Sequence, residues 1–254
     1  MERIGKKRYT NAPSMQKFTS TCTAINQLNH NVVELVLDKP ANFTYQAGQY
    51  ILIDTPLVED VNDIQPRAYS LSSSPHEGKL KLIIKLEESG RMSNYLRDVF
   101  KAGDSMTFTA AMGSLTLQEK DKTDVNRPLV WIGTSSGIVP YIGHVLWLQK
   151  QEYTHSMTLI FGVKHAEDFF HVELLKQLAS EIENFTLVTA VSQPDDTWQG
   201  TVGRVTEVMQ QQDINWAASM VYACGNPAMV KDVKRICIEE LGVPKQQMKI
   251  EGYV

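Results

Sequence analysis

Cysteine is scarce in this chain of 254 residues, and the three that occur lie far apart. They are Cys22, Cys224 and Cys237, and no Cys-x-x-Cys pair is present. Disulfide frameworks, structural zinc sites and iron–sulfur clusters all need several suitably spaced cysteines. The sequence therefore predicts no metal site built from the chain's own thiolates.

Long apolar runs are also missing. No stretch approaches the roughly 18 consecutive apolar residues that indicate a transmembrane helix. The segment Glu2–Thr10 is polar and basic, and it lacks the apolar centre of a signal peptide. We therefore expect no membrane insertion and a cytoplasmic protein.

A strong basic excess, typical of proteins that bind nucleic acids, is absent too. The net charge is −4, so we expect no nucleic-acid partner. The contents of 43% hydrophobic and 21% charged residues are ordinary for a globular protein. The length suffices for two domains of typical size, and we expect a monomer.

The first half of the chain consists of short runs of β-forming residues separated by glycine and proline turns. One helix is expected, from Met92 to Phe100. Many short strands with a single helix are typical of a small antiparallel barrel, which we place at residues 15–120. The expected strands are Val32–Leu37, Tyr50–Ile53, Leu80–Leu86 and Ser105–Thr109.

The second half alternates between strands and helices, which predicts a parallel sheet with helices on both faces. We place this α/β domain at residues 127–254, after a polar linker at Gln118–Arg127. The expected strands are Pro128–Ile132, Met157–Phe161, Phe185–Val188 and Met220–Cys224. The expected helices are Tyr141–Lys150, Val172–Ile182, one that begins at Val205 and one that begins at Ala228.

The run Arg67-Ala68-Tyr69-Ser70 combines side chains that suit a flavin dinucleotide. Arginine supplies a fork of donors for a pyrophosphate, and tyrosine supplies an aromatic plate for the isoalloxazine. The serine hydroxyl donates or accepts beside a redox nitrogen. Alternation in an extended chain puts Arg67 and Tyr69 on one face and Ser70 on the other or along the edge. The competing interpretation is an exposed strand with an incidental arginine and tyrosine.

A second segment, Gly90-Arg91-Met92-Ser93, is a glycine turn that opens a helix. Free backbone amides and the helix dipole make such a turn a seat for phosphate. The simpler interpretation is a helix cap, in which Ser93 caps the helix and Met92 faces the core. The two interpretations are compatible, since a cap residue can also face a phosphate.

Two glycine-containing loops follow strands in the second half. The loop Gly133–Pro140 lies between a strand and a helix, as a dinucleotide-binding loop does, although it is not the strict Gly-x-Gly-x-x-Gly pattern. The run Cys224-Gly225-Asn226-Pro227 repeats this arrangement after a later strand. Ligands of open α/β sheets bind at the carboxyl ends of strands, so both loops are candidates for a nucleotide site. The alternative for Cys224 is a small buried apolar residue.

The order of these segments resembles the ferredoxin–NADP reductase superfamily over nearly the whole chain, from about Phe18 to Val254. Members of that family fold as an antiparallel FAD barrel followed by a nucleotide-binding α/β domain. This agrees with the two halves described above. The matching segments are Arg67–Ser70, Gly90–Ser93, Gly133–Pro140, Cys224–Met229 and Glu251–Tyr253.

The resemblance implies a role for each matching residue. The implied FAD-binding residues are Arg67, Ala68, Tyr69, Ser70, Gly90, Arg91, Met92 and Ser93. The implied residues for the nicotinamide nucleotide are Gly133, Thr134, Gly137, Gly225 and Met229. The implied catalytic residues are Ser70 near flavin N5, Cys224 beside the nicotinamide, Glu251 in proton and electron traffic, and Tyr253 as an aromatic lid.

Two departures from the family pattern stand out. The nucleotide loop contains Thr-Ser-Ser-Gly where the family more often has Thr-Gly-Thr-Gly, so its backbone angles are expected to differ. Val254 follows Tyr253, so the aromatic residue is penultimate rather than final. A frayed terminus is the alternative interpretation of Tyr253.

The coenzyme is predicted to be NADPH or NADH. Lys164, His165 and Arg204 follow or flank strand ends, where they would meet a 2′-phosphate, and this favours NADPH or use of both. Ser192 is a further candidate residue for binding the coenzyme. Against this, Gln193 stands where NADP-specific relatives often have arginine, and Asp195 would repel a phosphate. Solvated surface charge is the alternative interpretation of Lys164 and Arg204.

These features together predict an FAD-dependent oxidoreductase that passes electrons between NAD(P)H and a ferredoxin or flavodoxin. The run Ser93-Asn94-Tyr95-Leu96 resembles the reductase components of ring-hydroxylating oxygenases. Those usually carry a [2Fe–2S] domain, so here the cluster would lie on a separate partner. The alternatives are a free-flavin or ferric reductase and the reductase component of an oxygenase. A further alternative is a non-catalytic nucleotide-sensing module, which would be expected to have lost Tyr69, Ser70 or Cys224.

Overall fold

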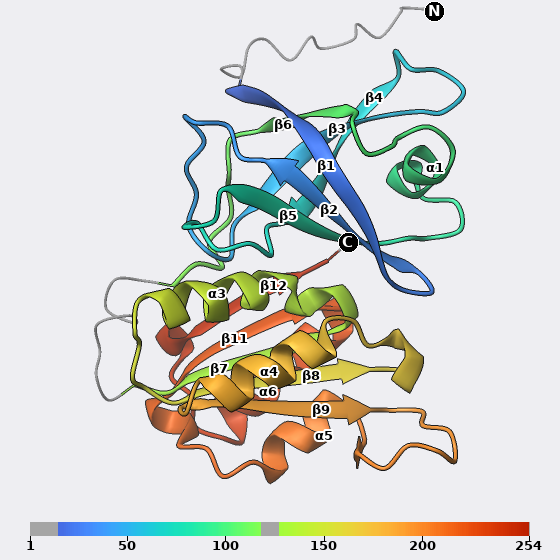
Figure 1. The fold of residues 1–254 in the computed structure, drawn as a ribbon. Coiled ribbons are helices and arrows are strands. Elements are labelled where there is room, and N and C mark those ends of the chain that lie inside the picture. The colour runs from blue at the N-terminus through green and yellow to red at the C-terminus, as the bar shows by residue number, and fades with distance from the viewer. Residues whose placement is uncertain (1–14, 118–126, 254) are drawn as a thin grey trace, which may run out of the picture.

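The computed structural model describes residues 15–117 and 127–253, so Val254 and all of the expected linker except Arg127 lie outside the described residues. Figure 1 shows two layered bodies, an antiparallel sheet above a parallel one, with the end of the chain between them. We call them the N-terminal barrel (β1–β6 with α1) and the C-terminal domain (β7–β12 with its helices). The expected order of an all-β unit followed by an α/β unit is confirmed.

The N-terminal barrel is a six-stranded antiparallel sheet with the order β4-β3-β6-β1-β2-β5. The bridge from Leu71 to Leu82, and a 2.9 Å hydrogen bond from the Ser72 amide to the Lys81 carbonyl, join its two edges. The expected barrel is therefore present. Its elements are β1 (Lys17–Asn29), β2 (Val32–Asp38), β3 (Tyr50–Pro56), β4 (Ile64–Ser70), β5 (Lys79–Lys85), α1 (Arg91–Asp98) and β6 (Ser105–Thr109).

Two strands of the barrel were not predicted, β1 and β4. Strand β1 alternates between exposed and buried positions, but Ser20 is one of its buried residues, so its hydrophobic pattern is weak. Strand β4 contains Pro66 and is exposed over most of its length. It lies at an edge of the sheet order, where a proline does not interrupt hydrogen bonding between central strands.

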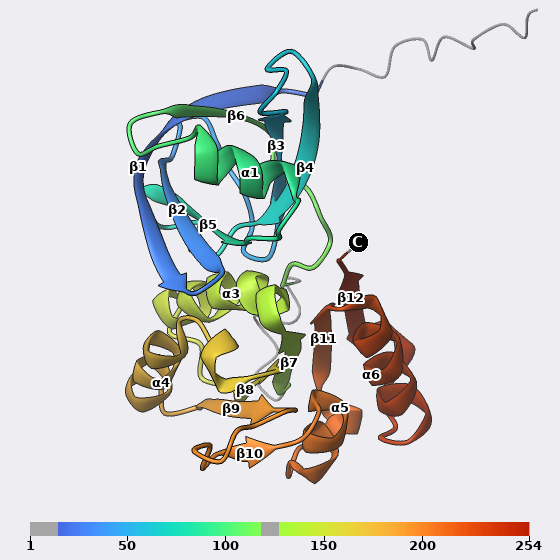
Figure 2. The same ribbon diagram turned by 90° about the vertical axis from the view of Figure 1, so that its right-hand side faces the viewer.

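The C-terminal domain is a six-stranded parallel sheet with the order β10-β9-β8-β7-β11-β12. Figure 2 shows α3 and α4 on one face and α5 and α6 on the other. The strands are β7 (Leu129–Thr134), β8 (Met157–Val163), β9 (Phe185–Val191), β10 (Thr201–Val202), β11 (Met220–Gly225) and β12 (Met248–Gly252). The helices are η1 (Ser135–Ile138), α3 (Val139–Lys150), η2 (Ala166–Asp168), α4 (Val172–Glu181), α5 (Val205–Val208), η3 (Met209–Gln211), η4 (Trp216–Ala218), α6 (Pro227–Glu239) and η5 (Lys245–Gln247).

Strands β10 and β12 are additions to the predicted sheet, and the helix expected from Val205 is a single turn. From β7 the chain proceeds to β8 and β9 on one side, and it then returns to place β11 and β12 on the other. The strand order therefore reverses between β7 and β11. Ligands of open α/β sheets bind outside the carboxyl ends of the strands at this point.

Helix α3 carries much of the packing between the barrel and the sheet. At Gly143, an added Cβ would lie 3.1 Å from the Ser73 carbonyl oxygen and 3.2 Å from that of Leu71, so the helix lies close against the barrel backbone. The buried His144 ring bonds to the Ala47 carbonyl at 3.2 Å through Nε2. Burial lowers the pKa of His144 to about 3, so the ring is neutral at physiological pH.

Among the residues that the structure describes, no helix combines the length and apolar character needed to cross a membrane.

The loop after β7 contains a residue in the left-handed region. Ser135 has φ 51°, a conformation that glycine adopts freely and other residues adopt at a cost. This is the position at which the sequence departs from the glycine that the family resemblance leads us to expect. The backbone of the loop thus takes a conformation that suits glycine, although the residue is serine.

Replacing Ser135 by glycine is expected to stabilise the protein by about 0.5–1 kcal/mol, because the relieved strain exceeds the extra unfolded-state entropy of glycine. Urea unfolding of Ser135→Gly against the parent chain measures this difference. Ser136→Gly is the matched control, since Ser136 lies in η1 and is not among the positive-φ residues, so it should destabilise. Equal destabilisation by both variants would contradict the account.

Candidate functional site

A cavity of about 540 Å³ lies at the junction of the barrel and the C-terminal domain. The barrel contributes β3, β4 and β5 with the loop after β5, and the C-terminal domain contributes η1, α3 and the end of β12. Its size is within the range of small-molecule and cofactor sites. The lining residues are Tyr50, Arg67, Ala68, Tyr69, Ser70, Ile83, Lys85, Glu87, Ser136, Val139, Glu251, Gly252 and Tyr253.

All four residues of the Arg67–Ser70 run line this cavity. Arg67 is exposed, and its guanidinium donates to the Pro66 carbonyl at 3.0 Å and to Gln65 Oε1 at 2.9 Å. Burial raises the pKa of Tyr69 to about 12, so its ring is a neutral plate. Ser70, at the end of β4, is buried.

Helix α1 uses its first side chains for packing and support. The N-cap is Gly90, which has no side chain to cap with, so the interpretation of Ser93 as the cap is wrong. The buried Ser93 hydroxyl instead accepts a 2.9 Å hydrogen bond from the Glu87 amide. Met92 is buried in the barrel core, as expected.

Arg91 lies against the loop between β3 and β4. Its guanidinium donates to the Asp63 carbonyl at 2.6 Å and to Asp63 Oδ2 at 3.0 Å, and its side chain is 11% exposed. This side chain therefore fixes a loop 28 residues earlier in the chain. The first backbone amides of an α-helix such as α1 have no acceptor within the helix, so they are the groups of this segment that could meet a phosphate.

The two glycine-containing loops of the C-terminal domain meet at the point where the strand order reverses. A Cβ added at Gly137 would lie 2.2 Å from the Cys224 carbonyl oxygen, so only glycine fits there. A Cβ added at Gly225, which has φ 130°, would lie 2.8 Å from Thr134 Oγ1 and 3.3 Å from Met229 Cε. These predicted nucleotide-site residues are therefore close neighbours, and Gly133 pairs directly with Cys224 across β7 and β11.

Tyr253 joins these loops to the barrel. Its amide donates to the Gly225 carbonyl at 2.9 Å, and its hydroxyl lies 3.0 Å from Ser70 Oγ. The same hydroxyl makes a side-chain hydrogen bond with the Cys224 thiol. The frayed terminus considered from the sequence is thus wrong for Tyr253, which is anchored at both its backbone and its side chain.

Burial controls the protonation of the remaining groups. It raises the pKa of Cys224 to about 12, although a hydrogen bond from Tyr253 opposes the effect. The thiol is therefore protonated at neutral pH and is no nucleophile. Burial also raises the pKa of Glu251, which pairs with Cys224 between β12 and β11. Among the described residues, no group of three or more histidine, cysteine or acidic side chains could hold a metal ion.

The residues considered for a 2′-phosphate lie away from the cavity, at the carboxyl ends of β8 and β9 and at the start of α5. Lys164 is exposed directly after β8, and Arg204 is the exposed N-cap of α5. Ser192 donates to the Val163 carbonyl at 3.4 Å. The neighbouring His165 ring bonds through Nδ1 to the Gln193 carbonyl at 3.0 Å.

Several lining residues were not singled out from the sequence: Tyr50, Ile83, Lys85, Glu87, Ser136 and Val139. Tyr50 pairs with Ser70 in the β3–β4 ladder. The pairing of β3 with β4 would have identified Tyr50 as a neighbour of Ser70. The sequence alone did not give the register of that pairing, because β4 itself was not predicted.

Two family models match the chain, an oxidoreductase FAD-binding domain over residues 20–117 and an oxidoreductase NAD-binding domain over residues 131–235. The toluate 1,2-dioxygenase electron transfer component of Pseudomonas putida is 27% identical over 220 residues, covering 86% of this chain and 62% of that protein. The anthranilate 1,2-dioxygenase electron transfer component of Acinetobacter baylyi is 28% identical over 228 residues, covering 88% and 64%. The chain therefore spans less than two thirds of the length of these relatives.

A solved ferredoxin NADP+ reductase from Neisseria gonorrhoeae, with bound FAD and NADP, has a TM-score of 0.80. It is 19% identical, and the match covers 93% of this chain and 98% of that one. The fold is therefore shared over nearly the full described length. With both domain models matched in order, the chain belongs to the ferredoxin–NADP reductase superfamily.

Proposed function

We propose that this protein is an FAD-dependent oxidoreductase that passes electrons between NAD(P)H and a redox partner. The observation that carries the proposal is the junction cavity. There Tyr69 and Ser70 of the barrel meet Glu251 and Tyr253 of the C-terminal domain. We assign residues 15–120 to the FAD domain and 127–254 to the nucleotide domain.

The residues present fit FAD. Tyr69 and Ile83 give the cavity flat apolar surface, which suits an isoalloxazine ring, and Arg67 places a cation at its edge. The first amides of α1, from Arg91 to Ser93, would hold the pyrophosphate with Arg67. When bound, FAD supplies the redox chemistry, accepting a hydride and releasing electrons singly.

The residues around Tyr253 define where the nicotinamide would lie. Ser70 and Cys224 both contact the Tyr253 hydroxyl, so moving that ring away frees one hydroxyl and one thiol at the same place. The neutral thiol of Cys224 then shapes the site and does not attack the substrate. Glu251, whose pKa is raised by burial, would hold or release a proton at the cavity.

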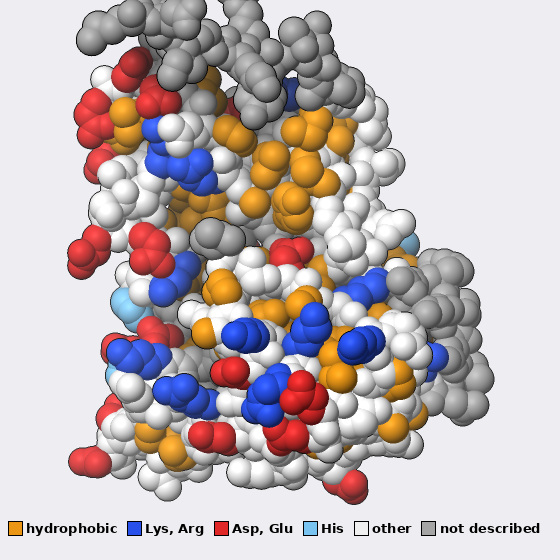
Figure 3. Space-filling view, turned by 180° about the vertical axis from the view of Figure 1, so that it is seen from behind, with side chains coloured by type: hydrophobic (Ala, Val, Ile, Leu, Met, Phe, Trp, Pro, Cys, Tyr) orange, Lys and Arg blue, Asp and Glu red, His pale blue; other side chains and the backbone are white. Residues whose placement is uncertain are grey.

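The acceptor that we propose is a protein carrying an iron–sulfur cluster or flavin, such as a ferredoxin, a flavodoxin or an oxygenase component. The support is that relatives are named electron transfer components of dioxygenases. Seen from behind, hydrophobic side chains gather on the N-terminal barrel, and lysines and arginines mixed with acidic residues cover the C-terminal domain (Figure 3). Strong electron transfer to free flavin or ferric ion, with weak FAD retention, would favour the small-molecule alternative.

The sequence favoured NADPH or use of both coenzymes, whereas we infer from the residues beyond β9 that the coenzyme is NADH in preference to NADPH. The exposed Asp195 accepts hydrogen bonds from Thr197 Oγ1 at 2.6 Å and from its amide at 2.9 Å. These hydrogen bonds lower the pKa of Asp195, which keeps it charged. A carboxylate beyond the end of β9 suits a ribose hydroxyl and repels a 2′-phosphate. We further propose that the protein is cytoplasmic, since the three cysteines are free thiols, and that it is a monomer.

The purified protein is expected to be yellow with FAD, and to bleach on anaerobic addition of NAD(P)H. Arg67→Ala should lower FAD affinity about 10- to 100-fold, because it removes charge-assisted hydrogen bonds to the pyrophosphate. Fluorescence titration with FAD measures this change. Lys17→Ala, which breaks a surface ion pair with Asp54 in the same barrel, is the control and should bind FAD normally. A colourless protein that no added FAD restores would overturn the proposal.

Asp195→Asn is expected to raise kcat/KM for NADPH about fivefold and to leave that for NADH within about twofold, because one repulsive charge is removed. Steady-state reduction with each coenzyme provides the measurement. The exposed neighbour Asp196 supplies the matched control, Asp196→Asn. If the parent chain uses both coenzymes equally and Asp195→Asn changes neither, the inference of NADH preference is wrong.

A further inference from the structure

The turn between β1 and β2 reaches the C-terminal domain on the side of β8. Asn29, the last residue of β1, donates through Nδ2 to the Asp168 carbonyl at 3.0 Å and to the Phe169 carbonyl at 3.3 Å. Its Oδ1 accepts from the Asn31 amide at 3.0 Å, which fixes the orientation of the side-chain amide. The hairpin thus holds two consecutive backbone carbonyls of the other domain.

A second contact lies next to the first. His171 Nε2 is 3.1 Å from Glu34 Oε1, and the two side chains are only 18% and 10% exposed. Asn26 donates to the other carboxylate oxygen, Oε2, at 3.1 Å. Burial would raise the pKa of Glu34, but the hydrogen bonds from His171 and Asn26 outweigh it, so the pKa is lowered and the carboxylate is charged.

The backbone at His171 is strained. It has φ 51° at the N-cap of α4, a left-handed conformation that a residue with a side chain adopts at a cost. Such a conformation persists where surrounding contacts hold it, and the Glu34 carboxylate is the contact that the barrel makes with its ring. The barrel therefore fixes both ends of the Asp168–His171 segment.

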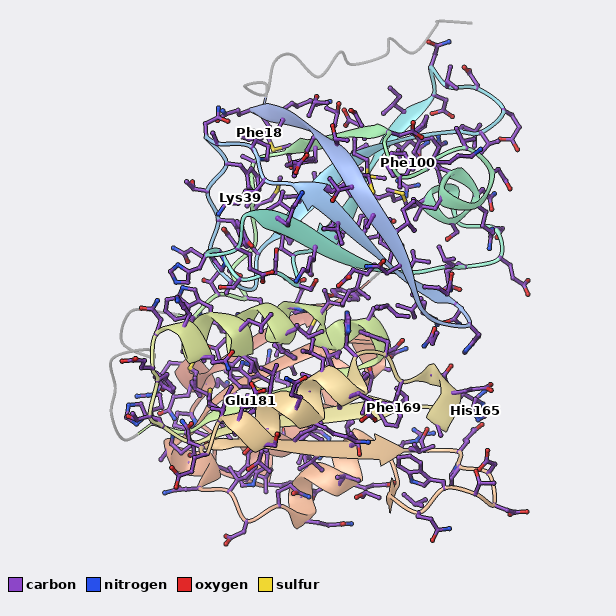
Figure 4. The ribbon with its side chains drawn as sticks, viewed as in Figure 1. Phe18, Lys39, Phe100, His165, Phe169 and Glu181 are labelled. Carbon is purple, nitrogen blue, oxygen red and sulfur yellow. The ribbon has the colours of Figure 1, made fainter. Side chains whose placement is uncertain are left out.

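The other side of this segment forms the edge where the adenosine of a dinucleotide would lie. Asp168 Oδ2 accepts from the His165 amide at 2.9 Å, and the His165 ring bonds to the Gln193 carbonyl beyond β9. The Phe169 ring packs against Phe161 at 5.0 Å between centroids. Figure 4 shows His165 and Phe169 at the ends of the strands, below the hairpin.

Phe169 also reaches the loop between β9 and β10, where its ring lies 5.7 Å from that of Trp198. One short segment, from His165 to His171, thus connects the hairpin to the ends of β8 and β9. The hairpin contact is therefore linked to the ends of these strands through consecutive residues and the two ring contacts of Phe169.

We propose that Asn29 and Glu34 of the barrel are positioning residues for nicotinamide-nucleotide binding by the C-terminal domain, which rests on the function proposed above. Neither side chain lines the junction cavity. They hold the His165–His171 segment in the conformation that the adenosine half requires. Binding of that half therefore depends on two side chains that belong to the flavin domain.

The test compares FAD-loaded variants of the full chain. Asn29→Asp keeps the acceptor for Asn31 and loses the donor to the two carbonyls, and Glu34→Gln keeps the shape and removes the charge. Each should raise the Kd for ADP-ribose, measured by calorimetry, about fivefold, as expected for the loss of one or two hydrogen bonds. KM for the dinucleotide should rise similarly, with kcat and FAD affinity unchanged.

Gln27→Ala is the matched control, because Gln27 donates only to the Asn29 and Val32 carbonyls inside the same hairpin. It should leave the Kd for ADP-ribose unchanged. If the parent chain binds ADP-ribose and is reduced, but the Kd is unchanged in both test variants, the positioning role is overturned and the proposed function stands. A fall in FAD affinity equal to the loss of ADP-ribose binding also overturns it, since the hairpin would then only stabilise the fold. A parent chain that binds no ADP-ribose overturns the proposed function as well.

Discussion

The contact between Gly137 and the Cys224 carbonyl is the constraint on which the rest of the site depends. Because the two backbones touch, the loops after β7 and β11 occupy one small volume where the strand order reverses. The neighbouring strand β12 then ends beside them, and Tyr253 reaches the barrel from that end. A bulkier residue at position 137 would separate the loops and shift every group that Tyr253 contacts.

Helix α3 begins directly after this contact, and it sets the position of the barrel relative to the C-terminal domain. Pro140 lies in its first turn, and the helix packs under the barrel through Gly143 and His144. The cavity is therefore bordered on one side by a short loop and on the other by a barrel strand. Both are held by the same helix, so the two halves of the site share one rigid support.

The sequence predicted those parts of the fold that have a simple hydrophobic period. The central strands of the parallel sheet and the helices α3 and α4 consist of continuous or amphipathic apolar runs, which identify them locally. Strand β1, with Ser20 inside, and strand β4, with Pro66, have no such period and were missed. Their conformation comes from pairing with distant strands, and pairing is not written in any short window.

The site shows the same division. The Arg67–Ser70 run was found because the needed side chains are consecutive, and the structure places all four in one cavity. The contacts of Arg91 and Ser93 were not foreseeable, since their partners are Asp63, in a loop 28 residues away, and the Glu87 amide. The sequence of a segment shows which side chains it carries, but the loop that packs against the segment depends on the folded sheet.

Strand β1 has a consequence for the order in which the protein folds. One part of it pairs with β2, which follows directly, but its first residues pair with β6, and Thr19 meets Thr107, which lies 88 positions later in the chain. Closing such a long loop costs entropy before any contact compensates for it, so barrel closure is expected to be slow. Until β6 is made, the start of β1 presents an unpaired edge to other chains, and this is the stage at which the nascent protein is most exposed to aggregation.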